Sequence, residues 1–470
     1  MKLACGFARP CVWRTRPWLL GVAAVAVACA AGLVLHFGSR GGAASDRPLV
    51  IVVSADTAGW IIPCGCTTNQ SGGLARRATY IKQLAVDSDV IVADAGGAAG
   101  GDSAYDRLKF AAILSGEEAM GLAAHNLGGS ELSLGADECR RLAEGGAPLI
   151  SANTTDRGGK PIVAPLKIVD AGGRRIALVG VVSPHYATAE IQVAPPGPAV
   201  LSALHDVAGR YDAAVVLAYL PTEELETLAH ELPEVDAIVG GPTLQSIPPH
   251  KSGPTLVTSI TNKGKFLATL RWQRPRDKSS SGSGGWNAEI VEVAEPLADD
   301  SGQLAGVRRF EEELSQRDFT PAEAGFAPMT AESQPTDSAV AGSDACRKCH
   351  AAESHVCDAS RHHGAWQSLV AKGFSADAFC QRCHTNAYGL PGGFVSARRT
   401  PDRVNVDCES CHGPASVHVK DPKNRTPFTA REQCTRCHDR ENSPQFVYDT
   451  YWPRIEHGSP ATKPGTEIAP

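Results

Sequence analysis

Four copies of a Cys-x-x-Cys-His motif follow one another near the end of this 470-residue chain. Two thiols at this spacing reach the two vinyl groups of one haem and form thioethers, and the adjacent histidine ligates the iron. The sequence therefore predicts four covalently bound haems c. The attachment residues would be Cys346, Cys349, Cys380, Cys383, Cys408, Cys411, Cys434 and Cys437, and the proximal iron ligands would be His350, His384, His412 and His438.

Zinc binding and disulfide bonding account less well for the cysteine pairs. Zinc sites use Cys-x-x-Cys pairs too, but they do not require a histidine directly after every second cysteine. A plain disulfide framework is the remaining interpretation. Each haem iron also binds a sixth ligand or keeps an open position. The further histidines of the region are His355, His362, His363, His418 and His457.

Residues 345–458 resemble the tetrahaem cytochromes c of the nitrification type, which accept electrons from hydroxylamine oxidation. The matching stretches surround Ser360-Arg-His362, Cys411 to His418, and Glu441 to His457. The resemblance implies distal iron ligation by His362, His418 and His457. In that family one haem is five-coordinate.

Two features of this region leave alternatives open. The haem on His384 has no obvious distal histidine, so its iron either keeps an open position or is ligated by His355 or His363. Cys357 is an extra thiol where the family usually has an aromatic residue, and it has either a packing role or a redox role.

The larger first part of the chain alternates apolar runs with segments of helical spacing. The runs are rich in Val and Ile and indicate buried strands. Strands that alternate with helices predict an α/β sandwich. The predicted strands are 49–53, 89–93, 174–182, 213–219, 235–240, 255–260, 266–272 and 286–293, and the predicted helices are 73–86, 104–124, 222–232 and 303–317.

This first part resembles the calcineurin-like metallophosphoesterase domain of bacterial 5′-nucleotidases, over about residues 48–275. The resemblance lies in Asp56, the stretch from Gly72 to Thr79, Asp94 to Gly96, Glu131 and the stretch from Asp236 to Gly241. Active members bind two metal ions that generate hydroxide and polarise the phosphoryl group. Of the ligands, only Asp56 is kept, and the family's other motif positions hold Ala58, Gly97, Gly129, Ser130, Tyr219, Pro242 and Leu244. The resemblance therefore implies a degenerate domain without phosphatase activity. We interpret Asp56, Asp94, His125 and Glu131 as fold residues with satisfied partners.

A Cys64-Gly-Cys66 pair follows the first predicted strand, where the lost metals would have been. Gly65 allows a tight turn between the two sulfurs. The pair is either a local disulfide in a strained turn or a redox-active or metal-binding pair.

The N-terminus predicts export. Basic residues precede an apolar run from Trp18 to Leu35, which is about the length of one membrane crossing. The run is either an uncleaved anchor or a cleaved signal, and both place the chain on the periplasmic side. The net charge of -6 shows no basic stripe, so nucleic acid is not an expected partner.

The predicted divisions are the N-terminal segment (1–45), the phosphoesterase-like domain (46–300), a helix and linker (301–343), the haem domain (344–460), which is mainly helical and loop-rich, and a tail (461–470). The expected function is electron transfer with redox partner proteins, and an electron carrier is favoured over an enzyme. The alternatives are a haem redox enzyme acting on a nitrogen or sulfur oxide, and a 5′-nucleotidase-like hydrolase fused to a cytochrome.

Overall fold

The computed structural model describes residues 47–63, 70–273, 285–328, 337–426 and 428–458, which belong to one compact unit, Asp46–Pro470. The predicted export segment, Cys64, Cys66 and the C-terminal tail lie outside the described residues. No helix within these ranges is long and apolar enough to cross a membrane. We call residues 47–317 the α/β region and residues 337–458 the haem-motif region.

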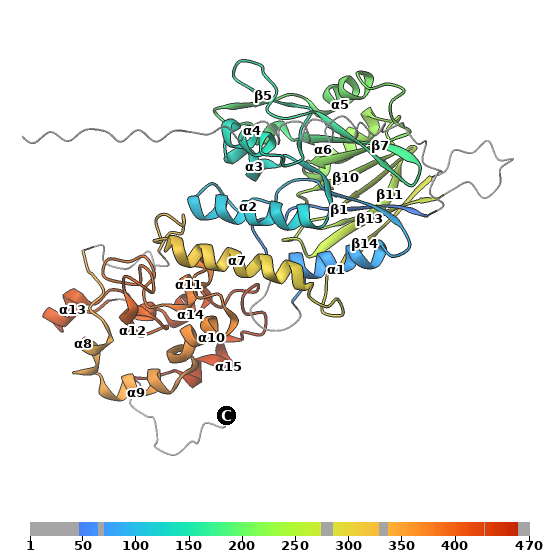
Figure 1. The fold of residues 1–470 in the computed structure, drawn as a ribbon. Coiled ribbons are helices and arrows are strands. Elements are labelled where there is room, and N and C mark those ends of the chain that lie inside the picture. Colours follow the sequence, from blue (N-terminus) through green and yellow to red (C-terminus); the bar gives the residue numbers. More distant parts are fainter. Residues whose placement is uncertain (1–46, 64–69, 274–284, 329–336, 427, 459–470) are drawn as a thin grey trace, which may run out of the picture. The chain divides into compact units, whose positions relative to one another are not determined.

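Most strands of the described residues form two large mixed sheets (Figure 1). The first sheet has the order β14-β13-β1-β2-β3-β4, in which β1 to β4 pair in parallel, β13 pairs antiparallel with β1, and β14 pairs antiparallel with β13. Its strands are β1 (Leu49–Ser54), β2 (Asp89–Asp94), β3 (Leu122–Asn126), β4 (Leu149–Ile150), β13 (Phe266–Gln273) and β14 (Gly285–Glu292).

The second sheet has the order β11-β12-β10-β9-β7-β6, with antiparallel strands at both edges and parallel strands between them. Its strands are β6 (Leu166–Ala171), β7 (Arg174–Val182), β9 (Ala213–Tyr219), β10 (Ala237–Gly241), β11 (Ile247–Ser252) and β12 (Thr255–Ser259). The short strands β5 (Thr154–Asp156) and β8 (Ile191–Val193) pair with each other.

The main core lies between the two sheets. Ile51 and Val53 of the first sheet share one fully buried cluster with Leu178, Val215 and Val239 of the second. Parallel strands that are covered on both faces require nearly continuous apolar runs, which is why these strands are so rich in Val, Ile and Ala. The result is the predicted α/β sandwich.

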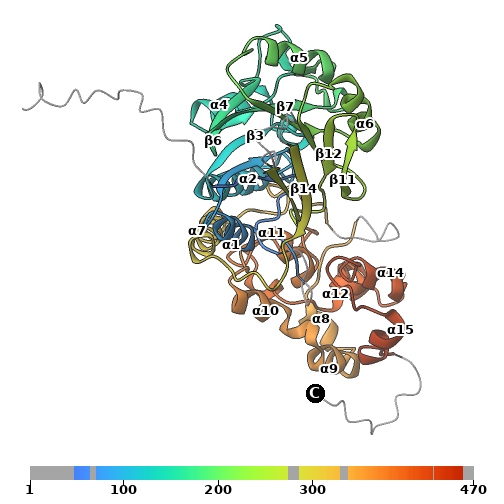
Figure 2. The same cartoon turned by 90° about the vertical axis from the view of Figure 1, so that its right-hand side faces the viewer.

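Helices cover the outer faces of the sandwich (Figures 1 and 2). Ile81 of α1 packs with Val50 and Val52 on the first sheet, and Leu225 of α6 packs with Val216 on the second. Helix α7 packs along α2 and α1. The helices are α1 (Leu74–Leu84), α2 (Ala104–Ala119), α3 (Gly129–Ser133), α4 (Ala136–Glu144), α5 (Pro196–His205), α6 (Thr222–Glu231) and α7 (Ser301–Arg317).

The haem-motif region consists of short helices and loops. Its own apolar cluster is small and contains Trp366, Leu369, Tyr388 and Phe394. The helices are α8 (Ser343–Arg347), α9 (Ala351–Ala359), α10 (Ala365–Lys372), α11 (Ala378–His384), α12 (Cys408–His412), α13 (Ser416–Lys420), α14 (Ala430–Thr435) and α15 (Tyr448–Tyr451). The second Cys-x-x-Cys-His motif thus forms the end of α11, and the third forms the whole of α12.

Two details differ from the sequence-based predictions. The helix predicted for 104–124 ends at Ala119, because Gly121 adopts φ +86° and turns the chain into β3. The predicted linker 318–343 is not loose at its described ends, where Ala324 and Val340 are buried. Small side chains allow this segment to pack closely, although its composition resembles that of a flexible linker.

Candidate functional site

The structure brings three predicted proximal histidines next to the three predicted distal ones. In each pair the two residues come from separate segments of the sequence. The ring centroids are 6.2 Å apart for His350 and His418, 6.0 Å for His438 and His362, and 5.7 Å for His412 and His457.

This spacing is what one metal ion between two imidazole rings requires. A bond of about 2.0 Å from metal to nitrogen and about 1.1 Å from nitrogen to ring centre, counted twice, give roughly 6 Å. Burial lowers the pKa of His362, His412 and His438. A metal binds only the neutral form of imidazole, so the lowered pKa values favour ligation. The histidines therefore fit the haem irons that the motifs imply.

His384 is held in a different way. Its Nδ1 donates a hydrogen bond to the Ala365 carbonyl at 2.9 Å and lies 3.3 Å from Ser368 Oγ. A hydrogen bond at Nδ1 fixes the tautomer and orients Nε2 as the ligand. The structure does not pair His384 with either of the two suggested alternatives: His355 is exposed, and His363 lies 3.6 Å from Asp358.

Four of the eight predicted attachment sulfurs lie close together, in two groups. Cys383 is hydrogen-bonded to Cys437, which joins the second and fourth motifs. Cys408 is hydrogen-bonded to Cys346 and to the extra thiol Cys357, which joins the first and third motifs. Hydrogen bonding to these two thiols lowers the pKa of Cys408.

Glu409 is a positioning residue that sequence analysis missed. It lies inside the third motif and is 2% exposed. Its carboxylate accepts hydrogen bonds from the backbone amides of Ala341, Gly342 and Ala415, at 2.7, 2.7 and 2.9 Å. Glu409 thereby ties the segment before the first motif to the third motif. No sequence pattern marks this residue, because either intervening position of the motif accepts many residue types.

In the α/β region, Asp56 follows β1 at the carboxyl end of the first sheet. Its Oδ2 accepts hydrogen bonds from Thr261 Oγ1 at 2.6 Å and from the Asn262 amide at 3.2 Å. Burial raises the pKa of Asp56. The one retained ligand of the phosphoesterase motif is therefore engaged by protein groups.

Two tyrosines fill the space next to Asp56 where the resemblance places metal ligands. A Cβ atom added at Gly97 would lie 2.4 Å from the ring of Tyr219, and one added at Gly129 would lie 2.3 Å from the ring of Tyr186. The two rings are 5.3 Å apart between centroids. Burial raises the pKa of Tyr219, so its phenol stays neutral and is a poor metal ligand.

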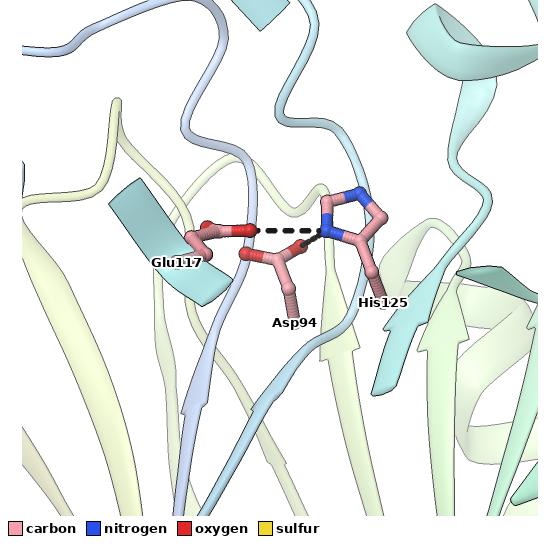
Figure 3. A group of neighbouring side chains, drawn as sticks. All are labelled: Asp94, Glu117 and His125. Atoms are coloured by element: carbon pink, nitrogen blue, oxygen red, sulfur yellow. Dashed lines mark hydrogen bonds and ion pairs between the residues drawn. The ribbon is translucent and has the colours of Figure 1, made fainter. Parts of the chain in front are cut away.

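Asp94, Glu117 and His125 form a buried group whose ligand atoms are close enough to hold a metal ion (Figure 3). His125 Nδ1 lies 3.2 Å from Glu117 Oε2 and 3.9 Å from Asp94 Oδ1. Arg77 Nη1, also buried, lies 2.9 Å from Glu117 Oε1. Arg77 therefore already supplies a cation to this group, which links α1, β2, α2 and β3.

Protonation balances the remaining charge of the cluster. Burial raises the pKa of Asp94 to about 7. Burial opposes a charge on His125, but the carboxylates of Asp94 and Glu117 outweigh this effect and raise the pKa of His125. The cluster is thus neutralised by protein groups and protons.

Glu131 holds the loop that follows β2. Its carboxylate accepts hydrogen bonds from the amides of Gly97, Ala98 and Ala99 at 3.0, 2.6 and 3.0 Å, and from the Gly128 amide at 2.9 Å. Burial works against the ionised form, but the hydrogen bond and charge of His125, together with these amides, lower the pKa of Glu131. Glu131 is a satisfied fold residue, as the sequence predicted.

In comparisons with known proteins the haem-motif region is similar to cytochromes c, and this similarity supports covalently bound haem c. The family described as cytochrome c554 and c-prime matches residues 345–413. Among curated proteins, cytochrome c-554 of Nitrosomonas europaea is 27% identical over 171 residues, which cover 28% of this chain and 73% of that protein.

Solved structures similar to the chain include a 5′-nucleotidase precursor from Thermus thermophilus, with 19% identity and a TM-score of 0.49 over 58% of this chain. Another is the sulfate thiohydrolase SoxB of Thermus thermophilus, with 16% identity and a TM-score of 0.49 over 60% of this chain. The chain spans 60% and 62% of the length of these two proteins. The architecture of the α/β region is established by its own strand order.

Proposed function

We propose that this chain is an exported multihaem cytochrome that transfers electrons between redox partner proteins. The observation that supports this most strongly is the set of three histidine pairs about 6 Å apart, each containing the histidine of a Cys-x-x-Cys-His motif. Each pair is spaced for two axial ligands on one iron.

The proposal assigns four haems c to the chain. Bound haem supplies one-electron redox chemistry. The cysteine pairs would form the thioethers, and the histidines would hold the irons. One iron each would be held by His350 with His418, by His412 with His457, and by His438 with His362. The close approach of Cys383 to Cys437, and of Cys346 to Cys408, would bring the haems of these motifs near each other.

A second candidate function follows from His384, which has a backbone and a hydroxyl partner but no axial histidine partner among the described residues. If the iron on His384 keeps an open position, it can bind a small ligand. The chain would then act as a haem redox enzyme on a nitrogen or sulfur oxide. Ser368 and the Ala365 carbonyl would hold the proximal ring in place.

We propose no hydrolytic role for the α/β region. Tyr219 and Tyr186 occupy the space next to Gly97 and Gly129, and Asp56 is bonded to Thr261 and Asn262. A site that activates water between two metals requires most of its ligands together. A role in docking or sensing a redox partner fits this region better. Membrane attachment and a periplasmic location remain part of the proposal and rest on the N-terminal sequence.

The histidine variants His362→Ala, His418→Ala and His457→Ala test the proposal. The protein is produced in a host with cytochrome c maturation and should gain the mass of four haems. Each variant should keep four haems and convert one of them from low spin to high spin in paramagnetic resonance and absorption spectra. His355→Ala, which changes an exposed histidine of the same region, should leave the spectrum unchanged.

Two results would count against the proposal. Haem that is extracted by acidified acetone, or zinc in its place, would show that the motifs do not attach haem. Parent-like spectra for all three variants would show that the paired histidines are not ligands. A high-spin signal already in the parent protein would favour the open iron on His384.

A further inference from the structure

A buried polar cluster joins the α/β region to the helix that bears the second Cys-x-x-Cys-His motif. Tyr105 of α2 donates a hydrogen bond from Oη to Asp377 Oδ1 at 2.7 Å. Lys109 lies one turn further along α2, with its Nζ 2.7 Å from Tyr105 Oη and 3.8 Å from Asp377 Oδ2. These contacts connect segments far apart in the chain, since Tyr105 and Asp377 are separated by 272 positions.

Asp377 is also the N-cap of α11. Its Oδ1 accepts a hydrogen bond from the Phe379 amide at 2.8 Å, and its carbonyl accepts one from the Cys380 amide at 3.0 Å. An N-cap carboxylate satisfies the free amides of the first turn and interacts with the helix dipole. The charge of Asp377 is therefore fixed directly beside the first attachment cysteine of this helix.

Glu311 of α7 adds a second carboxyl group to the cluster. It is 9% exposed, and its Oε2 has no hydrogen-bond partner within the described residues. Burial, followed by the charge of Asp377, raises the pKa of Glu311 to about 9, while Lys109 lowers it. The charged and titratable groups that act on Glu311 are Tyr105 and Lys109 from α2 and Asp377 from α11. Arg382 of α11 lies over the ring of Phe379.

Aromatic rings surround the cluster. Trp60 contacts Phe379 edge to face at 5.2 Å, and Tyr105 contacts Phe326 at 5.6 Å. Arg382 lies 4.9 Å above the centre of the Phe326 ring. Charges interact more strongly in such a poorly solvated setting than in water. A change of charge on a group bonded to α11 should therefore change the pKa of Glu311.

We propose that the interface acid cluster, which consists of Tyr105, Lys109, Glu311 and Asp377, takes up one proton when the haem bound through Cys380 and Cys383 gains one electron. This inference rests on the proposed function, since it requires that haem. It assigns to the interface a role that neither region has alone.

The step is balanced as follows. The electron comes from the one-electron donor protein of the proposed function, and the proton comes from solvent. The proton forms an O–H bond on a carboxyl oxygen of Glu311, and no bond of the protein breaks. The Asp377 carboxylate keeps its contacts with Tyr105, Lys109 and the amide of Phe379.

The direction of the pH dependence follows from the charges. An added negative charge raises the pKa of a nearby carboxyl group. Glu311 is then protonated in the reduced protein and ionised in the oxidised protein at every pH between the two pKa values. The pKa of about 9, which burial and the charge of Asp377 produce, marks the upper end of this range, because the positive charge of an oxidised iron centre would lower it.

The test is a spectroelectrochemical titration of the full-length haem-loaded protein between about pH 6 and 10. One of the potentials should fall with pH by up to about 59 mV per unit, the value for one proton per electron. Glu311→Gln should remove this slope. Glu312→Gln, which changes the exposed neighbour on α7, should retain it.

Lys109→Met provides a second variant if Glu311→Gln does not fold. Loss of this positive charge should raise the pKa of Glu311 and move the sloping range to higher pH. A pH-independent set of potentials in the parent, or equal slopes in the parent and both interface variants, would overturn the inference. The haem mass of the same samples separates the two proposals: a protein without four haems contradicts the proposed function, and a protein with four haems but no slope contradicts only the proton coupling.

Discussion

The two regions of this chain differ in what occupies the position of a metal centre. In the α/β region, Tyr219 and Tyr186 lie where the family resemblance places metal ligands, and Arg77 supplies the cation for the buried acids. In the haem-motif region, paired histidine rings remain about 6 Å apart, with room for an iron between them. One region has therefore filled its site with side chains, and the other keeps its ligands ready for a cofactor.

The two regions also differ in the size of their buried apolar clusters. The sandwich buries a continuous cluster of strand residues such as Ile51, Leu178 and Val239. The haem-motif region buries only a small apolar cluster around Trp366 and Phe394 within its described residues. A protein region of this size with so few buried apolar side chains needs another source of stability. Covalently bound haems would provide the missing apolar core.

The largest expected effect comes from withholding haem. In a host without cytochrome c maturation, residues 344–458 should lose stable tertiary structure, because their apolar core would be absent, while the sandwich should stay folded. Hydrogen exchange should then show rapid exchange in the haem-motif region and strong protection in β1, β7 and β9. Equal protection of both regions without haem would contradict the comparison.

The next effect concerns the buried ion network of the α/β region. Arg77→Met removes the cation that balances Glu117, and the loss of one partner from a buried ion pair costs about 3–5 kcal/mol. Urea unfolding should show this decrease in the free energy of unfolding. Arg141→Met removes an arginine from an exposed pair with Glu138 and should change little. Equal decreases in the free energy of unfolding for the two substitutions would show that the buried pair of Arg77 and Glu117 contributes no more to stability than the exposed pair of Arg141 and Glu138.

A smaller effect is expected for Gly97→Asp, which restores one carboxylate of the family's metal site. The new Cβ atom would lie 2.4 Å from Tyr219, at a residue with φ +81°, so overpacking should cost about 1–3 kcal/mol. No manganese- or zinc-dependent hydrolysis of nucleotides should appear. Gly121→Asp is the control, because Gly121 also has positive φ but open space around it. Hydrolysis that Asp56→Ala abolishes would show that the site still binds metals.

The smallest effect is expected within the haem-motif region. Glu409→Gln keeps one oxygen acceptor for the amides of Ala341, Gly342 and Ala415 but loses the charge, and should cost about 1 kcal/mol. The thermal midpoint should fall slightly, and all attached haems should remain. Glu432→Gln, an exposed substitution just before the fourth motif, should have no measurable effect. Loss of haem from the Glu409 variant would mean that this residue controls attachment rather than stability.

The sequence predicted the parts of the fold that depend on local pattern. Continuous apolar runs identified most of the parallel strands, since strands such as β9 are buried on both faces, but the short parallel strands β3 and β4 were missed. The edge strand β14 was predicted, but the edge strand β11 was missed because its composition is irregular, with Pro248, Pro249 and His250. The end of α2 was missed because the turn at Gly121 interrupts a segment that stays apolar.

The residues of the candidate site also differ in how far the sequence predicts them. The haem-attachment residues follow from a five-residue motif, whereas the pairing of His350 with His418 depends on tertiary structure that spacing alone does not reveal. Family resemblance named the distal histidines but not their partners. Glu311 and Asp377 could not be predicted, because a single acidic residue on a helix usually faces solvent, whereas both are buried in the folded chain.

The four backbone hydrogen bonds that the Glu131 carboxylate accepts have a consequence for the environments in which this chain can work. A loop shaped by bound manganese or zinc changes when the concentration of that ion changes. Here a permanent carboxylate shapes the loop, so we expect the α/β region to keep its form through metal starvation and in the presence of chelators. Scarcity of iron would then affect this protein only by limiting the supply of haem.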